Sequence, residues 1–359
     1  MSGSAGPLPV LQVMRRPFPL GNHSIEGLFD TVREHMPASV RVTVGMAPRV
    51  GQGWGNRLAN LRWMRRARMP ITHITGDVTY LAAALPTRGT IITIHDVGWA
   101  PRSRLNRAVF DLLWIRMPVA RAERVTVVSE QVRQDVLAIT GADPAKVLVI
   151  PNCVHPAFTP GPAERAADTG VRRPVVLQVG TSANKNVERV AAALEGLDCE
   201  LHVIGALSDV QVAALRRHRV SYRVSVNLTR EGIVAAYREA DVLVFVSTFE
   251  GFGMPILEGQ GTGCPVVTSN IAPMREVAGE GACLVDPTSP EAIGTAVRRV
   301  LGDGRWREAL RERGFANVTR YGAAAVAAEY AALYHEVAAA GSAARVGPAR
   351  AVREPVGAD

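Results

Sequence analysis

Short apolar runs alternate with amphipathic stretches along most of the chain. Runs rich in Val and Ile, bounded by turn residues, are typical of buried strands, and the intervening stretches repeat apolar residues at helical spacing. Strands are predicted over 9–14, 40–44, 71–74, 90–94, 125–128, 147–150, 174–180, 201–204, 222–226, 242–246, 266–268 and 282–285. Helices are predicted over 24–34, 56–67, 104–121, 130–139 and through most of 289–339. Strand and helix in alternation predict an α/β protein with doubly wound parallel sheets.

The alternating pattern occurs in two series, separated by a segment rich in Pro, Ala, Gly and Arg. We predict a first domain over 1–158, a linker over 159–173 and a second domain over 174–320. A final helix is predicted over 321–340 and a disordered tail over 341–359. A chain of 359 residues with 47% hydrophobic content is long enough to bury two cores.

The most informative stretch is 247–258, which follows the apolar run 241–246. Gly251 and Gly253 permit a tight turn and close backbone approach to a ligand. Pro255 suits the first turn of a helix, where its missing N–H would have no partner. Because a helix start presents unpaired N–H groups and a partial positive charge, we predict an anion site here.

Two carboxylates flank this turn, Glu250 before it and Glu258 about one turn into the helix. On one continuous helix they would lie about 12 Å apart, whereas the carboxyl pair of a retaining glycosidase is separated by about 5 Å. A folded turn could shorten the distance, so the spacing weakens a hydrolase interpretation without excluding it. A division of labour fits better: Glu250 meets a polar group beside the phosphate, and Glu258 accepts hydrogen bonds from a diol such as ribose.

The segment Glu-Gly-Phe-Gly-Met-Pro, with a second Glu at 258, resembles the paired-glutamate signature of retaining glycosyltransferases of family 4, which have the GT-B fold. The resemblance implies two Rossmann-like domains, the second holding a nucleoside diphosphate sugar and the first the acceptor. It also implies that the final helix crosses back to the first domain. The donor contacts that it implies within the motif are Glu250, Gly251, Phe252, Gly253, Met254 and Glu258.

The loops that follow other strands of the second domain extend the resemblance. The loop after the first of these strands corresponds to a family loop that contacts the donor diphosphate, through Gly180, Thr181, Ser182 and Lys185. Lys185 would offset charge on the leaving phosphate. The family usually has an arginine nearby, so either hydroxyls and backbone N–H groups share the phosphate or an arginine arrives from elsewhere. Asn227 lies in the loop whose family counterpart contacts the nucleobase.

In the first domain, the resemblance selects residues at the carboxyl ends of strands, where doubly wound sheets bind ligands. His95 matches a family histidine near the donor sugar, and we group it with Glu250 and Lys185 as catalytic. Asp96 could orient His95 or bind the acceptor. His73, at the end of the preceding strand, is a weaker candidate for the same site. The glycine loop after the first strand supplies Gly21 to the donor and Asn22 and His23 to the acceptor.

The composition argues against several other classes of protein. The formal charge of +8 reflects an arginine-rich chain in which only Lys146 and Lys185 are lysine, and we expect no nucleic-acid partner. The four cysteines form no C-x-x-C pair, which favours reduced, buried thiols. No Asp-x-Asp lies near a donor loop, and GT-B enzymes need no catalytic metal. We therefore expect no cofactor and no metal, with the nucleotide sugar as co-substrate.

The segment 56–68 combines five arginines with Leu58, Leu61, Trp63 and Met64. Such a basic amphipathic helix is typical of a solvated face over a core, and also of contact with an anionic membrane. Both interpretations stay open. In the absence of a signal sequence or an apolar run long enough to span a bilayer, we expect a cytoplasmic protein, peripheral at the inner membrane face where this helix binds lipid.

The resulting hypothesis is a retaining hexosyltransferase in bacterial polysaccharide, glycolipid or natural-product glycan biosynthesis, with a carbohydrate, lipid-linked or small-molecule acceptor. Two alternatives remain. A GT-B nucleotide-sugar 2-epimerase would convert its donor without an acceptor, and a non-catalytic nucleotide-sugar or glycan-binding protein is conceivable because the loop arginine is missing.

Overall fold

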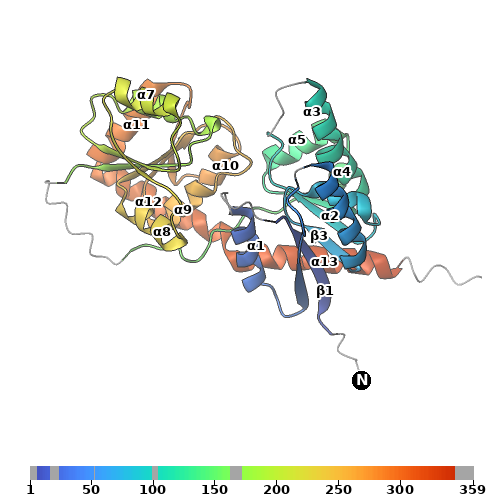
Figure 1. Cartoon of the computed structure of the whole chain (residues 1–359). Coiled ribbons are helices and arrows are strands. Elements are labelled where there is room, and N and C mark those ends of the chain that lie inside the picture. Colours follow the sequence, from blue (N-terminus) through green and yellow to red (C-terminus); the bar gives the residue numbers. More distant parts are fainter. Residues whose placement is uncertain (1–5, 17–23, 52, 99–103, 162–171, 344–359) are drawn as a thin grey trace, which may run out of the picture.

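The computed structural model describes residues 6–16, 24–51, 53–98, 104–161 and 172–343. These residues form two parallel six-stranded sheets with helices packed on their faces (Figure 1). The predicted fold class is confirmed. Within the described residues, no helix is both long enough and apolar enough to cross a membrane.

The first sheet has the strand order β2-β1-β3-β4-β5-β6. Its strands are β1 (Leu8–Met14), β2 (Val40–Met46), β3 (Ile71–Ile74), β4 (Thr90–Ile94), β5 (Arg124–Val127) and β6 (Val147–Val149). Its helices are α1 (Ser24–Glu34), α2 (Trp54–Ala67), η1 (Thr79–Ala84), α3 (Arg104–Phe110), η2 (Asp111–Arg116), α4 (Met117–Arg121), α5 (Glu130–Thr140) and η3 (Pro144–Lys146). The helix predicted over 104–121 is therefore interrupted by the π-helical segment η2.

The second sheet has the strand order β12-β11-β10-β7-β8-β9. Its strands are β7 (Val175–Val179), β8 (Glu200–Ile204), β9 (Ser221–Ser225), β10 (Val242–Phe245), β11 (Val266–Ser269) and β12 (Ala282–Val285). Its helices are η4 (Ala183–Lys185), α6 (Val187–Ala193), α7 (Asp209–Arg217), α8 (Arg230–Glu239), α9 (Met254–Thr262), α10 (Met274–Ala278), α11 (Pro290–Gly302) and α12 (Gly304–Val318). The chain continues through η5 (Thr319–Tyr321) into α13 (Ala323–Ala343).

The strand order of the second sheet creates a switch point between β7 and β10. From β7 the chain proceeds through β8 to β9 on one side, and it then returns to β10 on the other side. Loops that follow strands at such a point diverge and leave room for a ligand. The loop after β7 contains residues 180–186, and the loop after β10 contains the turn at 247–253, so both predicted donor loops lie at the switch point.

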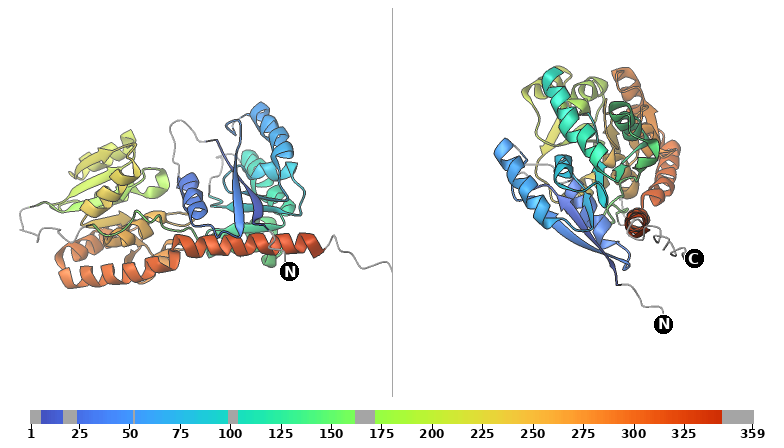
Figure 2. Two further views of the ribbon diagram at one scale, coloured as in Figure 1. Left: turned by 90° about the horizontal axis from the view of Figure 1, so that it is seen from below. Right: turned by 90° about the vertical axis from the view of Figure 1, so that its right-hand side faces the viewer.

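Helix α13 runs from the second domain along the first domain, as the left view of Figure 2 shows. It is longer than predicted and includes residues 341–343, whereas the rest of the predicted tail lies outside the described residues. The helix packs against β1, β3 and α1, and its residues Val326, Tyr330 and Tyr334 are buried. Much of the first domain's core is therefore completed by the last helix of the chain.

A buried polar network joins α13 to this sheet. The Tyr334 hydroxyl lies 2.8 Å from His73 Nδ1 and accepts a hydrogen bond of 2.9 Å from Gln12 Nε2. His73 Nε2 lies 2.7 Å from the Thr93 hydroxyl. His73 has no exposed surface. The suggestion that it faces the ligand site was therefore wrong, because both ring nitrogens are used inside the core.

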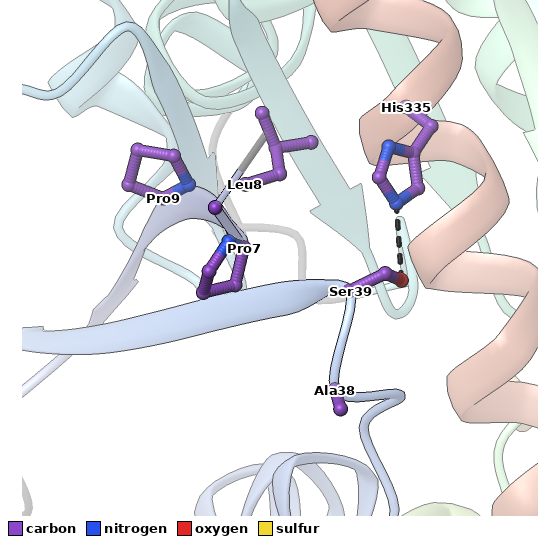
Figure 3. Close-up of a pocket in the computed structure, with 7 residues that line it drawn as sticks. Pro7, Leu8, Pro9, Ala38, Ser39 and His335 are labelled. Atoms are coloured by element: carbon purple, nitrogen blue, oxygen red, sulfur yellow. Dashed lines mark hydrogen bonds between the residues drawn. The ribbon is translucent and has the colours of Figure 1, made fainter. Parts of the chain in front are cut away.

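A pocket lies at the edge of the first sheet where β1 and β2 begin, opposite the carboxyl ends of the strands (Figure 3). Its lining is apolar apart from Ser39 and His335, whose Oγ and Nε2 atoms lie 3.2 Å apart. Ligands of doubly wound sheets bind at the carboxyl ends of strands, so this pocket is not where we place the active site.

Proton binding to His73 should make stability depend on pH. Burial lowers the pKa of His73 to about 3, whereas an unfolded histidine titrates near about 6.5. The stability that neutral His73 contributes is therefore complete above about pH 6.5 and is lost as the pH falls toward 3. Urea unfolding from about pH 7 to pH 4 should give a slope that is steeper in the wild type than in His73→Gln, by up to about 1.4 kcal/mol per pH unit.

His335→Gln is the matched control, because His335 is an exposed histidine on α13. Its slope should equal that of the wild type. Parallel curves for the wild type and His73→Gln would contradict the prediction.

Candidate active site

The turn between β10 and α9 has the predicted strand, turn and helix geometry. Gly253 has φ 107°, in the left-handed region that favours glycine, and α9 begins directly after it. Glu250 lies before the turn, and Glu258 lies on α9. Pro255 has no N–H and the Ile256 N–H donates to the Gly253 carbonyl at 3.0 Å, so this end attracts negative charge mainly through the helix dipole.

Lys185 and Glu250 form an ion pair across the two loops. Lys185 Nζ lies 2.5 Å from Glu250 Oε1, and the two side chains are only 18% and 15% exposed. The ammonium group also lies 4.6 Å from the centroid of the Phe245 ring. The sequence predicted separate roles for the two charges, but the structure brings them into direct contact. A ligand that uses either group must compete with the other.

Asn184 is a site residue that sequence reasoning missed. Its Nδ2 donates to the Phe249 carbonyl at 2.8 Å and to Glu250 Oε1 at 3.2 Å, and its own carbonyl accepts from Thr248 N at 2.9 Å. These contacts tie the loop after β7 to the loop after β10. The signal was present, since an amide beside the lysine of a donor loop can bond in both directions.

Glu258 is held by a buried tyrosine. The Tyr237 hydroxyl, on α8, donates to Glu258 Oε2 at 2.6 Å. Burial raises the pKa of Glu258, while the hydrogen bond from Tyr237 and the charge of Lys185 lower it. The net result is a raised pKa for Glu258, because Tyr237 and Lys185 only partly offset the effect of burial. Tyr237 was not among the predicted site residues.

The loop after β7 uses its hydroxyl groups internally. Thr181 Oγ1 donates to the Ala206 carbonyl at 2.7 Å, and Ser182 Oγ donates to Asn184 Oδ1 at 2.7 Å. Gly180 has φ 85°, and a β-carbon there would lie 3.0 Å from Lys185 Cε. Because both hydroxyl protons are engaged, phosphate binding by this loop would depend on Lys185 and on backbone N–H groups.

His95 lies where the first domain meets the turn. Its Nε2 is 2.9 Å from the Thr75 carbonyl, so Nε2 carries the proton and Nδ1 is the acceptor. Burial lowers the pKa of His95, which keeps the ring neutral. A β-carbon on Gly251 would lie 2.0 Å from the His95 carbonyl oxygen. The carboxyl ends of β4 and β10 are therefore in contact at this glycine.

The other residues predicted for the site have no contact with the Lys185–Glu250 pair among the interactions described above. Asp96 is exposed and accepts a hydrogen bond of 3.2 Å from Gly98 N. Asn227 is exposed with φ 53°, and Phe252 is buried against Tyr321 with ring centroids 5.8 Å apart. Met254, half-buried, is the first residue of α9. Gly21, Asn22 and His23 lie outside the described residues.

The four cysteines are free, and Cys283 is only half-buried, unlike the other three. In the part of the chain that the structure describes, no three His, Cys, Asp or Glu side chains are grouped so that they could hold a metal ion.

Comparisons of the sequence identify related proteins. Residues 173–303 match a family model described as Glycosyl transferases group 1, and residues 17–158 match one described as Glycosyltransferase Family 4. O-antigen chain mannosyltransferase B from Escherichia coli is 37% identical over 25% of this chain and 24% of its own length. O-antigen chain mannosyltransferase RfbU from Salmonella typhimurium is 25% identical over 59% of this chain and 61% of its own. The chain thus spans about a quarter to three fifths of the length of these relatives.

Solved structures share the fold along nearly the whole chain. Sucrose-phosphate synthase from Thermosynechococcus elongatus has a TM-score of 0.75 and 18% identity, covering 93% of this chain and 100% of that one. HepE from Anabaena, in complex with UDP and glucose, has a TM-score of 0.73 and 15% identity, covering 92% and 100%. At these identities the likeness shows the fold.

Removal of the Tyr237 hydroxyl should destabilise the ionised form of Glu258 and thereby the folded protein. Tyr237→Phe keeps the ring but leaves Glu258 Oε2 without its donor, so the pKa of Glu258 should rise further. We expect the variant to be about 1–3 kcal/mol less stable than the wild type at neutral pH. The deficit should shrink as the pH falls, because a protonated Glu258 has less charge to stabilise. Urea unfolding at several pH values measures it; a deficit that does not change with pH would contradict the assignment.

Proposed function

The chain belongs to the GT-B glycosyltransferases of group 1 and family 4, and we propose that it transfers a hexose from a nucleoside diphosphate sugar to an acceptor hydroxyl with retention of configuration. The mannosyltransferase relatives, which act in O-antigen synthesis by name, favour a bacterial glycan as the product class. The UDP complexes of HepE favour a nucleotide sugar as donor.

One observation carries the proposal: Lys185, Glu250 and Glu258 are gathered around the start of α9 at the switch point of the second sheet. A diphosphate carries negative charge, and here it would meet an ammonium group and a helix start. Glu258, placed by Tyr237, would accept hydrogen bonds from the ribose hydroxyls. The diphosphate and the ribose of a nucleotide sugar would thus each have a chemical partner.

The Lys185–Glu250 ion pair suggests how donor binding would proceed. In the described structure each charge neutralises the other. On donor binding, the diphosphate would take over Lys185, and the released Glu250 would accept hydrogen bonds from the sugar hydroxyls. Charge that develops on the leaving phosphate as the glycosidic bond breaks would be stabilised by Lys185 and by α9, without a metal ion.

His95 would act from the first domain. Because its Nε2 proton is committed to the Thr75 carbonyl, the neutral ring offers only Nδ1 as an acceptor for a sugar hydroxyl. A neutral histidine is a poor proton donor to the leaving group, so on this proposal the departing phosphate itself takes the acceptor's proton. No side chain is required as a nucleophile.

Nucleotide binding is the first test. Thermal unfolding with UDP, GDP, ADP and dTDP should show a shift for one of them, because a ligand at 100 times its Kd adds about 2.7 kcal/mol of stability. The shift should persist in EDTA. It should be lost in Lys185→Ala and in Glu258→Gln, and the matching sugar nucleotide should be hydrolysed slowly without an acceptor.

Glu308→Gln is the control, since Glu308 is exposed on α12, away from the turn, and forms an ion pair with Arg311 on its own helix. It should retain the full shift. The absence of a shift for every nucleotide would refute the donor site, while binding without turnover of any sugar nucleotide would favour a non-catalytic binding protein.

We further propose that the exposed face of α2 in the first domain contacts an anionic membrane. Residues 35–76 contain seven arginines and no Asp or Glu. Large apolar side chains are exposed on α2 itself, namely Trp54 (71%) and Leu58 (48%). The exposed Val44 and Met46 of β2 flank Gly45, which faces Trp63 of α2, so they lie on the other side of the strand. Arg57 lies over both Trp54 and Trp114, at 5.4 and 4.6 Å from the ring centroids. Exposed Trp beside Arg is typical of a membrane interface.

Vesicle binding tests this face. Co-sedimentation should be stronger with vesicles that contain phosphatidylglycerol than with phosphatidylcholine alone, and it should weaken at high salt. Arg65→Gln should weaken binding roughly fivefold, in line with about 1 kcal/mol per basic residue, and Trp54→Ser should weaken it at any salt concentration. Val210→Ser on α7, which removes an equally exposed apolar side chain (67%), should have no effect. Equal losses in Val210→Ser and Trp54→Ser would contradict a specific face.

A further inference from the structure

The N-terminus of α5 in the first domain contacts the glutamate turn of the second domain. Ser129 Oγ, at the N-cap of α5, accepts a hydrogen bond from Val132 N at 3.2 Å. The same hydroxyl donates its proton to the Gly251 carbonyl at 2.8 Å. Ser129 is only 6% exposed, so water does not readily replace either partner. One small side chain therefore caps a helix and bonds across the domain interface.

The Gly251 carbonyl sits in a tightly packed place. A β-carbon on Gly251 would lie 2.0 Å from the His95 carbonyl oxygen, and one on Gly98 would lie 2.0 Å from Phe249 Cε1. The turn therefore touches the loop after β4 at two glycines, and the Ser129 hydroxyl is the polar contact beside them. Glycine imposes little conformational preference of its own, so contacts from outside must set the orientation of this peptide.

Orientation of this carbonyl has a consequence for the donor site. The Gly251–Phe252 peptide unit is planar and trans, so its carbonyl and the Phe252 N–H point in opposite directions. When Ser129 fixes the oxygen toward the first domain, the N–H is directed away from it, at the start of α9. Glu250 is the residue just before Gly251, and its side chain position follows from the same backbone.

We propose that Ser129 is a positioning residue for donor chemistry. By donating to the Gly251 carbonyl it orients the Phe252 N–H and the Glu250 backbone, and it makes the geometry of the donor turn depend on apposition of the two domains. One test of this inference measures enzyme kinetics, and that test rests on the proposed glycosyl transfer. The structural arm concerns only the turn and needs no substrate.

Three substitutions separate the hydroxyl's two roles. Ser129→Thr keeps both the cap and the donor. Ser129→Asp keeps the cap, because aspartate is a strong N-cap, but an ionised carboxylate cannot donate to a carbonyl and repels its oxygen. Ser129→Ala loses both. Ser208→Asp is the control, since Ser208 caps α7 in the same way, through Gln211 N, without contact to the turn.

The structural arm is hydrogen exchange of the peptide that covers 246–257 in the full-length protein, read together with thermal stability. Ser129→Asp buries a carboxylate against a carbonyl oxygen and should therefore be less stable than the wild type. Well below its unfolding temperature its faster exchange should be confined to this peptide, whereas Ser129→Thr and Ser208→Asp should match the wild type. Unchanged exchange in Ser129→Asp would overturn the proposal whatever the enzyme's substrate.

The kinetic arm uses hydrolysis of the sugar nucleotide that matches the nucleotide bound in thermal unfolding. We expect kcat for Ser129→Asp and Ser129→Ala to fall roughly 3- to 10-fold, the size of one lost neutral hydrogen bond, with nucleotide affinity changed less. A purely structural cap would leave kcat of Ser129→Asp unchanged, and that result would also overturn the proposal. Failure of the wild type to hydrolyse any sugar nucleotide would instead count against the proposed function, and the exchange arm would still decide the role of Ser129.

Discussion

The arrangement of the candidate site depends on the close approach of two backbones, at Gly251 and at the carbonyl of His95. A β-carbon on Gly251 would lie 2.0 Å from that oxygen, so no other residue fits without displacement of one domain. Because the approach occurs at the carboxyl ends of β4 and β10, it brings the loops of two separate sheets together. His95 from the first domain and Glu250 from the second are thereby brought close together, at a junction where one buried hydrophobic cluster contains residues of both sheets.

The electrostatics of the site are balanced before any ligand arrives. Lys185 and Glu250 neutralise each other in a partly buried setting, where an unpaired charge would be costly. Glu258 is stabilised by Tyr237 and by the charge of Lys185, against the effect of burial. One lysine therefore supports two carboxylates. A diphosphate that recruits this lysine would change the environment of both, which is a physical reason for donor binding and sugar positioning to be coupled.

The fold was predictable from the sequence to a considerable extent, because β-branched runs and helical spacing are local signals. Both sheets, and the turn with its glutamates, follow from that pattern and from the resemblance. The contacts across long sequence separations were not predictable. Tyr237 stands in an ordinary amphipathic helix, and nothing local indicates that it bonds to Glu258. His73 ends a strand just as His95 does, yet Tyr334, 261 residues away, holds it inside the core. Such choices depend on which faces of distant elements meet.

The last helix shows why distant contacts matter for the site. Tyr321, just before α13, accepts a backbone hydrogen bond of 3.0 Å from Val154 N of the first domain. Its ring packs on Phe252 of the glutamate turn, with centroids 5.8 Å apart. From there α13 continues to Tyr334, which is bonded to His73 and Gln12 inside the first sheet. The segment that holds the domains together therefore passes the donor turn where it crosses between them. A displacement of α13 on the first sheet would be transmitted to Phe252, which lies two residues before the start of the helix that we expect to meet the donor phosphate.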